Sequence, residues 1–380
     1  MRIGIMISPS HAIPPQEKII LAPWMVVHYL TEGLVATGRH QVYLFAAAGS
    51  ASSAHVYDFG IQPTGQIKSH VSDDVYRELR RTDEKNLFEH MIEIAQREHI
   101  DIIHLHQAVN MVPLIGAASK TLSFVITLHD PIVGRRLDAV NELHTFGNCS
   151  FVSISNAQKN NVSIPFAGTV YNGIQTREFL YDEHGGEHLL IAGRITPEKG
   201  TAQAILAALA LKKKLFVIGE PIVDTEKNSS YWYDSVRPYI DGKKIKHVGF
   251  IERNKLRTFY QKAKAMLVPI EWEEPFGLTM IESMACGTPV IAYGRGSVPE
   301  VIRDGVTGFI VNASDTDMRG EWIVKKTGLE GMKEAINRIY LLPQDQYQAM
   351  RRACRARVEQ LFTAERMVEN YEKVYEKILA

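Results

Sequence analysis

The chain has 380 residues, of which 45% are hydrophobic and 23% are charged, as in ordinary globular proteins. This length is too great for one ordinary core and predicts two domains of roughly 150 to 200 residues each. Lys plus Arg equals Asp plus Glu at 43 each, and the formal net charge of zero argues against a nucleic-acid-binding protein, which needs a basic surplus.

In the first half of the chain, short β-branched runs alternate with helical patterns, the clearest of which are 23–37 and 84–98. Apolar strands that alternate with helices predict a parallel sheet with both faces covered. The expected strands of this first series are 2–8, 41–47, 101–106, 123–129 and 150–155.

The pattern restarts after "YDEHGGEH", a turn-rich link within a boundary region at 165–187. Two such series predict an α/β protein with two doubly wound, Rossmann-like domains, 1–175 and 176–345. We expect the helical tail, 346–380, to pack back toward the first domain. A helix is expected at 201–214, between strands at 188–194, 214–220, 245–251, 265–270, 289–294 and 308–312.

The cysteines and the apolar runs of the sequence indicate the cellular compartment of the protein. Cys149, Cys286 and Cys354 are odd in number and widely spaced, which is typical neither of a disulfide framework nor of a metal site. The start of the chain lacks the pattern of a signal peptide, and no apolar run reaches the roughly 18 to 20 residues that span a bilayer. These features predict a cytoplasmic protein. The basic runs at 77–81 and 351–357 are compatible with peripheral contact to an anionic membrane, but their acidic neighbours favour solvated helix faces.

The segment "VPIEWEEPFGLTMIESMACG" reads as a strand, a loop, a turn and a helix. Gly277 allows close backbone approach to a ligand, and the helix that follows offers free N–H groups to a phosphate. Glu282 lies about one turn into this helix, where it can accept hydrogen bonds from a ribose diol. Glu274 precedes the turn and can bond a sugar hydroxyl. The alternative is a capped helix with two solvated glutamates.

A second motif is "AGRITPEKG", in which Arg194 and Lys199 lie between a strand end and a helix start. Two cations beside a helix N-terminus form a diphosphate clamp. Ordinary surface charges are the alternative for this motif taken alone. With a helix terminus and two cations to offset the phosphate charge, and no acidic pair at a plausible metal position, we expect neither a metal nor another cofactor. The acidic "SDTD" at 314–317 is interpreted as a loop.

The sequences "GRITPEKG", "EPFGLTMIE" and "ACGTPVIA…GSVPEVIRDGVTGFIV" resemble the retaining glycosyltransferases of family 4. The resemblance implies the GT-B fold, in which two Rossmann-like domains face each other across a cleft. It also implies transfer of a sugar from a nucleotide-sugar, such as a UDP- or GDP-sugar, to the hydroxyl of a sugar, glycolipid or other acceptor. The second domain would bind the nucleotide, and the first would bind most of the acceptor.

The resemblance also assigns roles to residues. His129 in "TLHD" would lie near the anomeric carbon and support developing positive charge, although a satisfied histidine at a strand end is the alternative. Glu274 would touch the donor sugar. No residue is a candidate for an enzymic nucleophile, so catalysis would rest on position and electrostatics. The residues expected to bind the donor are Arg194, Lys199, Gly219, Glu220, Phe250, Ile251, Phe276, Gly277, Leu278, Thr279 and Glu282.

The chain departs from the family pattern near its first helix, where Leu21 and Ala22 stand in place of a glycine pair. Pro23 is compatible with the first turn of a helix, but side chains replace the open backbone at this point. We expect Leu21, Ala22 and Trp24 to shape the acceptor side, with the flat indole ring stacking on a sugar. Packing of Trp24 between the helix and its sheet is the alternative.

Two other functions stay open on the same scaffold. One is a sugar phosphorylase, and the other is a nucleotide-sugar-binding subunit whose transfer activity is weakened by the replaced glycine loop. A nicotinamide-dependent oxidoreductase is disfavoured because the first strand-to-helix connection, "SPSHAIPP", lacks the Gly-x-Gly-x-x-Gly fingerprint.

Overall fold

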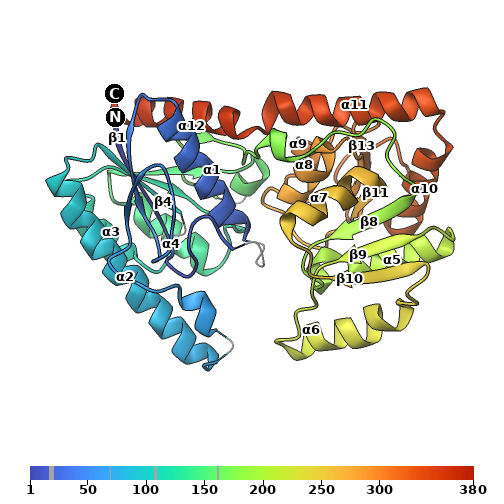
Figure 1. Ribbon diagram of the computed structural model, residues 1–380, viewed down its shortest axis with the longest axis horizontal. Helices are drawn as coiled ribbons and strands as arrows, with labels where there is room; N and C mark the ends of the chain where they lie inside the picture. Colours follow the sequence, from blue (N-terminus) through green and yellow to red (C-terminus); the bar gives the residue numbers. More distant parts are fainter. Residues whose placement is uncertain (17–20, 69, 107–108, 161) are drawn as a thin grey trace. The chain divides into compact units, whose positions relative to one another are not determined.

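The computed structural model describes residues 1–16, 21–68, 70–106, 109–160 and 162–380. The chain divides into two compact units. Unit 1 combines Met1–Gly173 with Ala364–Ala380, and unit 2 is Ile174–Thr363. Each unit is built on a parallel sheet with helices around it, as Figure 1 shows.

The described part of unit 1 contains a seven-stranded parallel sheet in the order β3-β2-β1-β4-β5-β6-β7. The order reverses between β1 and β4, so this is the topological switch point of the sheet. All five residues of β4 are buried, as expected for a strand covered on both faces. The strands are β1 (Arg2–Ile7), β2 (Gln41–Phe45), β3 (His55–Tyr57), β4 (Ile102–His106), β5 (Phe124–Thr127), β6 (Cys149–Ser153) and β7 (Gly168–Thr169).

Two helical layers cover the sheet of unit 1. One contains α1 and α12, which pack against each other although they lie at opposite ends of the sequence (Figure 1). The side chains of α2, α3 and α4 form the core on the other face, where the Phe88 and Phe124 rings stack. The helices are α1 (Ala22–Ala36), α2 (Asp73–Arg97), α3 (Val112–Ala118), α4 (Arg135–His144) and α12 (Ala364–Leu379), with short 3₁₀ turns at Thr64–Ile67 and Ala157–Lys159.

Unit 2 contains a six-stranded parallel sheet in the order β10-β9-β8-β11-β12-β13, with its switch point between β8 and β11. The strands are β8 (His188–Ala192), β9 (Leu215–Ile218), β10 (Ile245–Gly249), β11 (Ala263–Val268), β12 (Val290–Tyr293) and β13 (Gly308–Val311). Helices α5 and α10 pack together on the sheet, whereas α8 packs against both α7 and α11.

The helices of unit 2 follow the strands as a doubly wound fold requires, and the polar residues of interest lie in the connections at the carboxyl ends of the strands. The helices are α5 (Thr201–Ala210), α6 (Glu226–Ser230), α7 (Arg253–Lys262), α8 (Leu278–Ala285), α9 (Val298–Val301), α10 (Gly328–Leu341) and α11 (Gln344–Leu361). Short turns of 3₁₀ or π type occupy Thr176–Glu178, Pro197–Lys199, Tyr231–Val236 and Arg237–Tyr239.

The division into units differs in detail from the expected domains. The chain first passes from unit 1 to unit 2 after Gly173, two residues before the expected end of the first domain at 175. The expected tail, 346–380, is divided: α11 belongs to unit 2 and α12 to unit 1. The reason is that α11 packs against α8, and α12 packs against α1. The arrangement of the two units relative to each other stays a prediction.

The cysteines are unpaired, as their spacing predicts, and all three are buried. Burial raises the pKa of the Cys149 thiol to about 11 and that of Cys286 to about 12, which keeps both thiols neutral. In the acidic run after β13, Asp317 pairs with Arg295 at 2.8 Å, and Asp315 accepts a hydrogen bond from Thr327. None of the described helices combines the length and the apolar character that crossing a bilayer demands.

Candidate functional site

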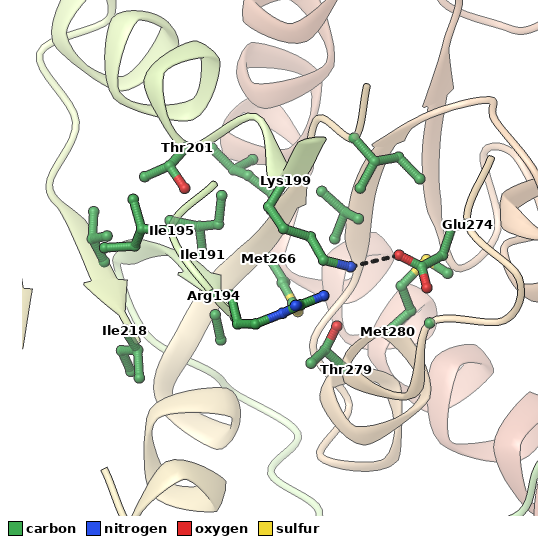
Figure 2. A pocket seen from close by; sticks show the side chains of 17 residues that line it. Ile191, Arg194, Ile195, Lys199, Thr201, Ile218, Met266, Glu274, Thr279 and Met280 are labelled. Atoms are coloured by element: carbon green, nitrogen blue, oxygen red, sulfur yellow. Dashed lines mark hydrogen bonds and ion pairs between the residues drawn. The ribbon is translucent and has the colours of Figure 1, made fainter. Parts of the chain in front are cut away.

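A pocket opens in unit 2 beyond the carboxyl ends of β8 and β11, the two strands that flank the switch point of the sheet. In open parallel sheets this is where ligands bind. Apolar residues such as Ile191, Val217 and Met266 line its inner part. Figure 2 shows the polar side chains that converge on the same space, and these are Arg194, Lys199, Thr201, Glu274 and Thr279.

Lys199 and Glu274 form the centre of this polar group. Lys199 Nζ donates to Glu274 Oε2 over 2.7 Å, and Trp272 Nε1 donates to the same oxygen over 3.0 Å. The ammonium group also lies 4.7 Å from the centre of the Trp272 ring, a cation–π contact that fixes it further. Within the described part of the chain, Oε1 of Glu274 has no hydrogen-bond partner. The carboxylate is therefore held in place with one oxygen left to accept from a ligand.

Two glycines bring helix N-termini to the pocket. Gly200 precedes α5 with a φ of 69°, and a Cβ atom there would lie 1.8 Å from the carbonyl oxygen of Pro269. Gly277 precedes α8 with a φ of 83°, and its Cβ atom would lie 2.4 Å from Met280. Both positions favour glycine because φ is positive, and at Gly200 the Pro269 backbone also leaves no space for a side chain. The N-terminus of α8, beginning with Leu278 and Thr279, therefore reaches the pocket with backbone N–H groups that favour an anion.

Arg194 adds a second cation. It follows β8 by two residues, is exposed, and points into the pocket beside Lys199 (Figure 2). Among the described residues, no carboxylate pairs with it. The pocket therefore holds one cation that is engaged by Glu274 and another that is available to a ligand anion.

The loop at 294–297, which follows β12, supports the segment that carries Glu274 through hydrogen bonds. The Ser297 N–H donates to the Glu274 carbonyl over 2.9 Å, and the Ser297 hydroxyl donates to the Phe276 carbonyl over 2.7 Å. The Gly296 N–H donates to the Glu273 carboxylate. Sequence reasoning missed this role: Gly296 and Ser297 belong to a motif that resembles the family, but nothing in the motif indicates which segment they contact. Its contribution appears only once β12 is placed beside β11.

Glu282 lies in the second turn of α8, outside the lining of the pocket. Its side chain is 10% exposed, and burial raises the pKa of the carboxyl group. Arg253 and Tyr260 of α7 oppose this shift by donating hydrogen bonds to the two carboxylate oxygens, each over 3.2 Å. The carboxylate is thus engaged from the side of α7.

The remaining donor-site candidates occupy the ends of β9 and β10. Glu220 accepts a hydrogen bond from the Phe250 N–H over 2.7 Å, and His247 bonds the Gly219 carbonyl over 2.8 Å. Ile251 is buried. These contacts tie the end of β9, which neighbours β8, to the end of the edge strand β10, and their role toward a ligand stays a prediction.

The Phe276 side chain belongs to the core rather than to the pocket. It is 2% exposed, and its ring meets the edge of Phe362. Only the backbone of Phe276 is therefore available to a ligand.

In unit 1, His129 follows β5 and is hydrogen-bonded to another histidine. His129 Nε2 lies 2.9 Å from His106 Nδ1, and the two rings stack with an angle of 14° between their planes. Burial lowers the pKa of His129 to about 4, so that the imidazole is neutral near pH 7. A neutral ring does not repel a developing positive charge, as the expected role requires.

A buried polar network continues from these histidines into α12. His104 bonds the Tyr375 hydroxyl over 2.7 Å and the Thr127 hydroxyl over 2.9 Å, and Thr127 in turn bonds Tyr371 over 3.2 Å. Burial lowers the pKa of His104 to about 3. Both histidines of β4, His104 and His106, are therefore part of the buried interior of unit 1. The network fastens the last helix of the chain to the middle of the sheet.

The first turn of α1 carries the three residues predicted for the acceptor side. Leu21 is half-buried and Ala22 is exposed, but the Trp24 side chain is only 7% exposed and meets His11 edge-on with ring centres 5.4 Å apart. Its indole N–H has no hydrogen-bond partner among the described residues. The burial supports the packing alternative for Trp24, and an acceptor role for this turn stays a prediction.

The two parallel sheets and the cation-lined pocket define a protein built from two Rossmann-like units, one of which is suited to an anionic ligand. Residues 176–355, nearly all of unit 2, match the family model described as "Glycosyl transferases group 1". Over this part of the sequence the chain is similar to the group 1 glycosyltransferases, as the motif resemblance predicts.

One relative is N-acetyl-alpha-D-glucosaminyl L-malate synthase of Bacillus anthracis, which is 27% identical over 76% of this chain and 78% of its own. The alignment with another curated glycosyltransferase spans 63% of that relative's length, just under two thirds.

Solved structures show the same fold over the whole chain. Sucrose-phosphate synthase of Thermosynechococcus elongatus matches with a TM-score of 0.76 and 19% identity, over 99% of this chain and 98% of its own. HepE of Anabaena, solved in complex with UDP and glucose, matches with a TM-score of 0.69 and 17% identity, over 99% and 100%. At this level of identity the likeness shows the fold alone, and it confirms the predicted α/β fold with two Rossmann-like domains.

Proposed function

We propose that this protein is a retaining glycosyltransferase that moves a hexose from a nucleoside-diphosphate sugar to an acceptor hydroxyl without a metal ion. The contact between Lys199 and Glu274, at the N-terminus of α8 and beside Arg194, carries the proposal. A sugar diphosphate presents anionic oxygens next to hydroxyl groups. The pocket presents cations and N–H groups next to an anchored carboxylate, which is the complementary arrangement.

In this proposal the leaving diphosphate binds to Arg194, Lys199 and the first backbone N–H groups of α8. Oxygen Oε1 of Glu274 accepts a hydrogen bond from a hydroxyl of the donor sugar, and Glu282 accepts from the ribose. The UDP bound by HepE supports a nucleotide-sugar donor, and UDP- and GDP-sugars are the donors to test first. We also propose that unit 1 binds the acceptor and that His129 supports the positive charge that develops at the reacting carbon.

Two considerations support the finer chemistry. Two cations and a helix N-terminus offset the charge of a leaving diphosphate, which is the task that a divalent metal performs elsewhere. Glu274 accepts hydrogen bonds from Lys199 and Trp272, an environment that suits a fixed acceptor rather than a nucleophile. A retaining outcome would then depend on the leaving phosphate taking the acceptor proton.

The proposal is tested with a panel of UDP-, GDP- and ADP-sugars in the presence of EDTA. We expect at least one donor to protect the protein against thermal unfolding and to be cleaved. Complete loss of cleavage with EDTA, restored by Mg²⁺ or Mn²⁺, would contradict the metal-free mechanism. Protection without any cleavage would instead favour a nucleotide-sugar-binding subunit, and cleavage of a disaccharide by inorganic phosphate would favour a phosphorylase.

A further inference from the structure

The contact between α7 and α8 contains an ion pair that no motif of the sequence indicates. Arg253, the first residue of α7, donates from Nη2 to Glu282 Oε1, while the Tyr260 hydroxyl donates to Oε2. The side chains of Arg253 and Glu282 are only 20% and 10% exposed. Each carboxylate oxygen therefore has one protein donor, and each keeps acceptor capacity for another hydroxyl.

We propose that Arg253 is a positioning residue for donor binding, which keeps the Glu282 carboxylate ionised and oriented so that it accepts hydrogen bonds from the ribose diol. This inference rests on the proposed function, because it takes Glu282 as the ribose contact. It adds a residue from α7 that acts through Glu282 rather than on the reacting atoms.

The charge balance around Glu282 makes Arg253 the decisive group. Burial favours the neutral carboxylic acid and raises its pKa, whereas Arg253, Tyr260 and Arg257 lower it. Tyr260 is neutral, because burial and the nearby carboxylate raise its pKa well above the ordinary value. Arg257 is bound to Glu178 over 2.5 Å. Of the described cations, only Arg253 bonds the carboxylate directly.

The other charged or titratable groups near α8 face elsewhere. Arg351 and Arg355 of α11 donate to the backbone carbonyls of Cys286 and Ala285. Lys264 of β11 lies over the Tyr347 ring. On β12, Tyr293 stays neutral, because burial raises its pKa. The Cys286 thiol is neutral for the same reason.

Arg253 also lies close to the strand ends that we assign to the donor. It is three residues beyond Phe250, whose N–H is bound by Glu220 at the end of β9. The start of α7 is therefore tied to both the loop after β10 and the carboxylate on α8. An arginine at this point couples the position of Glu282 to that loop.

The test measures affinity for UDP and GDP, and for their 2′-deoxy forms, by calorimetry between pH 5.5 and 8. The proteins are the wild type, Arg253→Met, Arg253→Lys and the control Arg257→Met. Without the Arg253 charge the carboxyl pKa rises, so the neutral form accumulates as the pH falls. We expect Arg253→Met to bind the ribose nucleotide at least fivefold more weakly than wild type at pH 6, and to recover as the pH rises. The affinity for the 2′-deoxy nucleotide should fall much less.

Arg253→Lys, which restores a charge, should move the pH profile back toward that of the wild type, and Arg257→Met, which removes a charge that does not bond the carboxylate, should shift the profile less than Arg253→Met does. The inference is overturned if the pH profile of Arg253→Met parallels that of the wild type. It is also overturned if ribose and 2′-deoxyribose nucleotides weaken equally, since that pattern indicates a direct phosphate contact. Arg253→Gln replaces the Met variant if circular dichroism shows that the latter is unfolded. If the wild type binds neither nucleotide, the proposed function itself fails.

Discussion

Glu274 and Glu282 are carried by one loop-and-helix segment with seven residues between them, yet they have different surroundings. Glu274 lies in the pocket with Lys199 as its partner, whereas Glu282 lies against α7 with Arg253. The sequence predicted that Glu274 precedes the turn and that Glu282 lies about one turn into the helix, and α8 begins at Leu278 accordingly. It did not predict the partners, because Lys199 and Arg253 are 75 and 29 residues away in the sequence and meet the carboxylates only in the folded unit.

We expect Lys199→Ala and Arg194→Ala to bind UDP and GDP more weakly than the wild type, by roughly 1.5 to 3 kcal/mol each, because charge-assisted hydrogen bonds to the diphosphate are lost. Calorimetry measures the change. Lys227→Ala is a matched control, since Lys227 is 72% exposed and pairs with Glu198 outside the pocket lining. Unchanged affinity in both pocket variants would remove these cations from the donor site.

Trp24→Ala distinguishes the two interpretations of the α1 turn. Because the ring is buried, we expect the free energy of unfolding of unit 1 to fall by about 3 kcal/mol or more, as for other truncated core aromatics. The free energy of unfolding should fall much less in Trp24→Phe. Urea unfolding followed by circular dichroism checks this expectation. A normal free energy of unfolding combined with a raised acceptor KM would show that packing is not the main role and would favour acceptor binding.

At the scale of the elements, the strands with strong apolar runs were predicted within a few residues of their ends. The two strands that were missed, β3 and β7, have three and two residues, too few for a periodic pattern. Helix α2 begins at Asp73 rather than near 84, because the Ser72 side chain accepts a hydrogen bond from the Val75 N–H and caps the helix there. That cap precedes a polar stretch, where apolar periodicity gives no signal.

The turn before α5 offers a direct test of how the pocket is built. Gly200→Ala should lower the free energy of unfolding of unit 2 by roughly 2 kcal/mol or more, because φ is positive there and the Pro269 carbonyl occupies the space of the new methyl group. Gly147→Ala is the control, as no atom lies within 4 Å of its Cβ position. Denaturant unfolding of both variants makes the comparison. Equal stability would refute the close approach that places Lys199 beside the pocket.

The histidines of β4 and β5 should make the stability of unit 1 depend on pH. The folded pKa values of His104 and His129 are about 3 and about 4, below the ordinary value near 6.5. The unfolded chain therefore binds more protons between pH 6.5 and 4. The free energy of unfolding should be highest above pH 6.5 and fall as the pH is lowered, by up to roughly 1.4 kcal/mol per pH unit for each histidine.

Urea unfolding at pH 7, 6 and 5, followed by circular dichroism, measures this slope. His104→Gln should reduce the slope between pH 6.5 and 5, whereas His144→Gln, which changes an exposed histidine, should not. An identical slope in wild type and His104→Gln would mean that His104 takes up its proton equally in the folded and unfolded chain.

At the scale of the whole molecule, alternating strands and helices predicted two doubly wound units, and the motifs predicted the glycosyltransferase family. The division of the tail was not predictable in the same way. Both α11 and α12 read as amphipathic helices, and only their partners, α8 in unit 2 and α1 in unit 1, decide where each belongs. The buried hydroxyls of Tyr371 and Tyr375 find their partners on strands more than 240 residues earlier in the sequence.

The central claim, retaining transfer from a nucleotide-sugar without a metal, is tested most directly by proton NMR of the first minutes of donor cleavage in EDTA. With an α-linked UDP- or GDP-hexose, we expect the sugar that is first released or transferred to keep the α configuration, before mutarotation mixes the anomers. The same product should form much more slowly with Lys199→Ala. Initial appearance of the β anomer, or no cleavage of any donor by a protein that binds the nucleotide, would contradict the account.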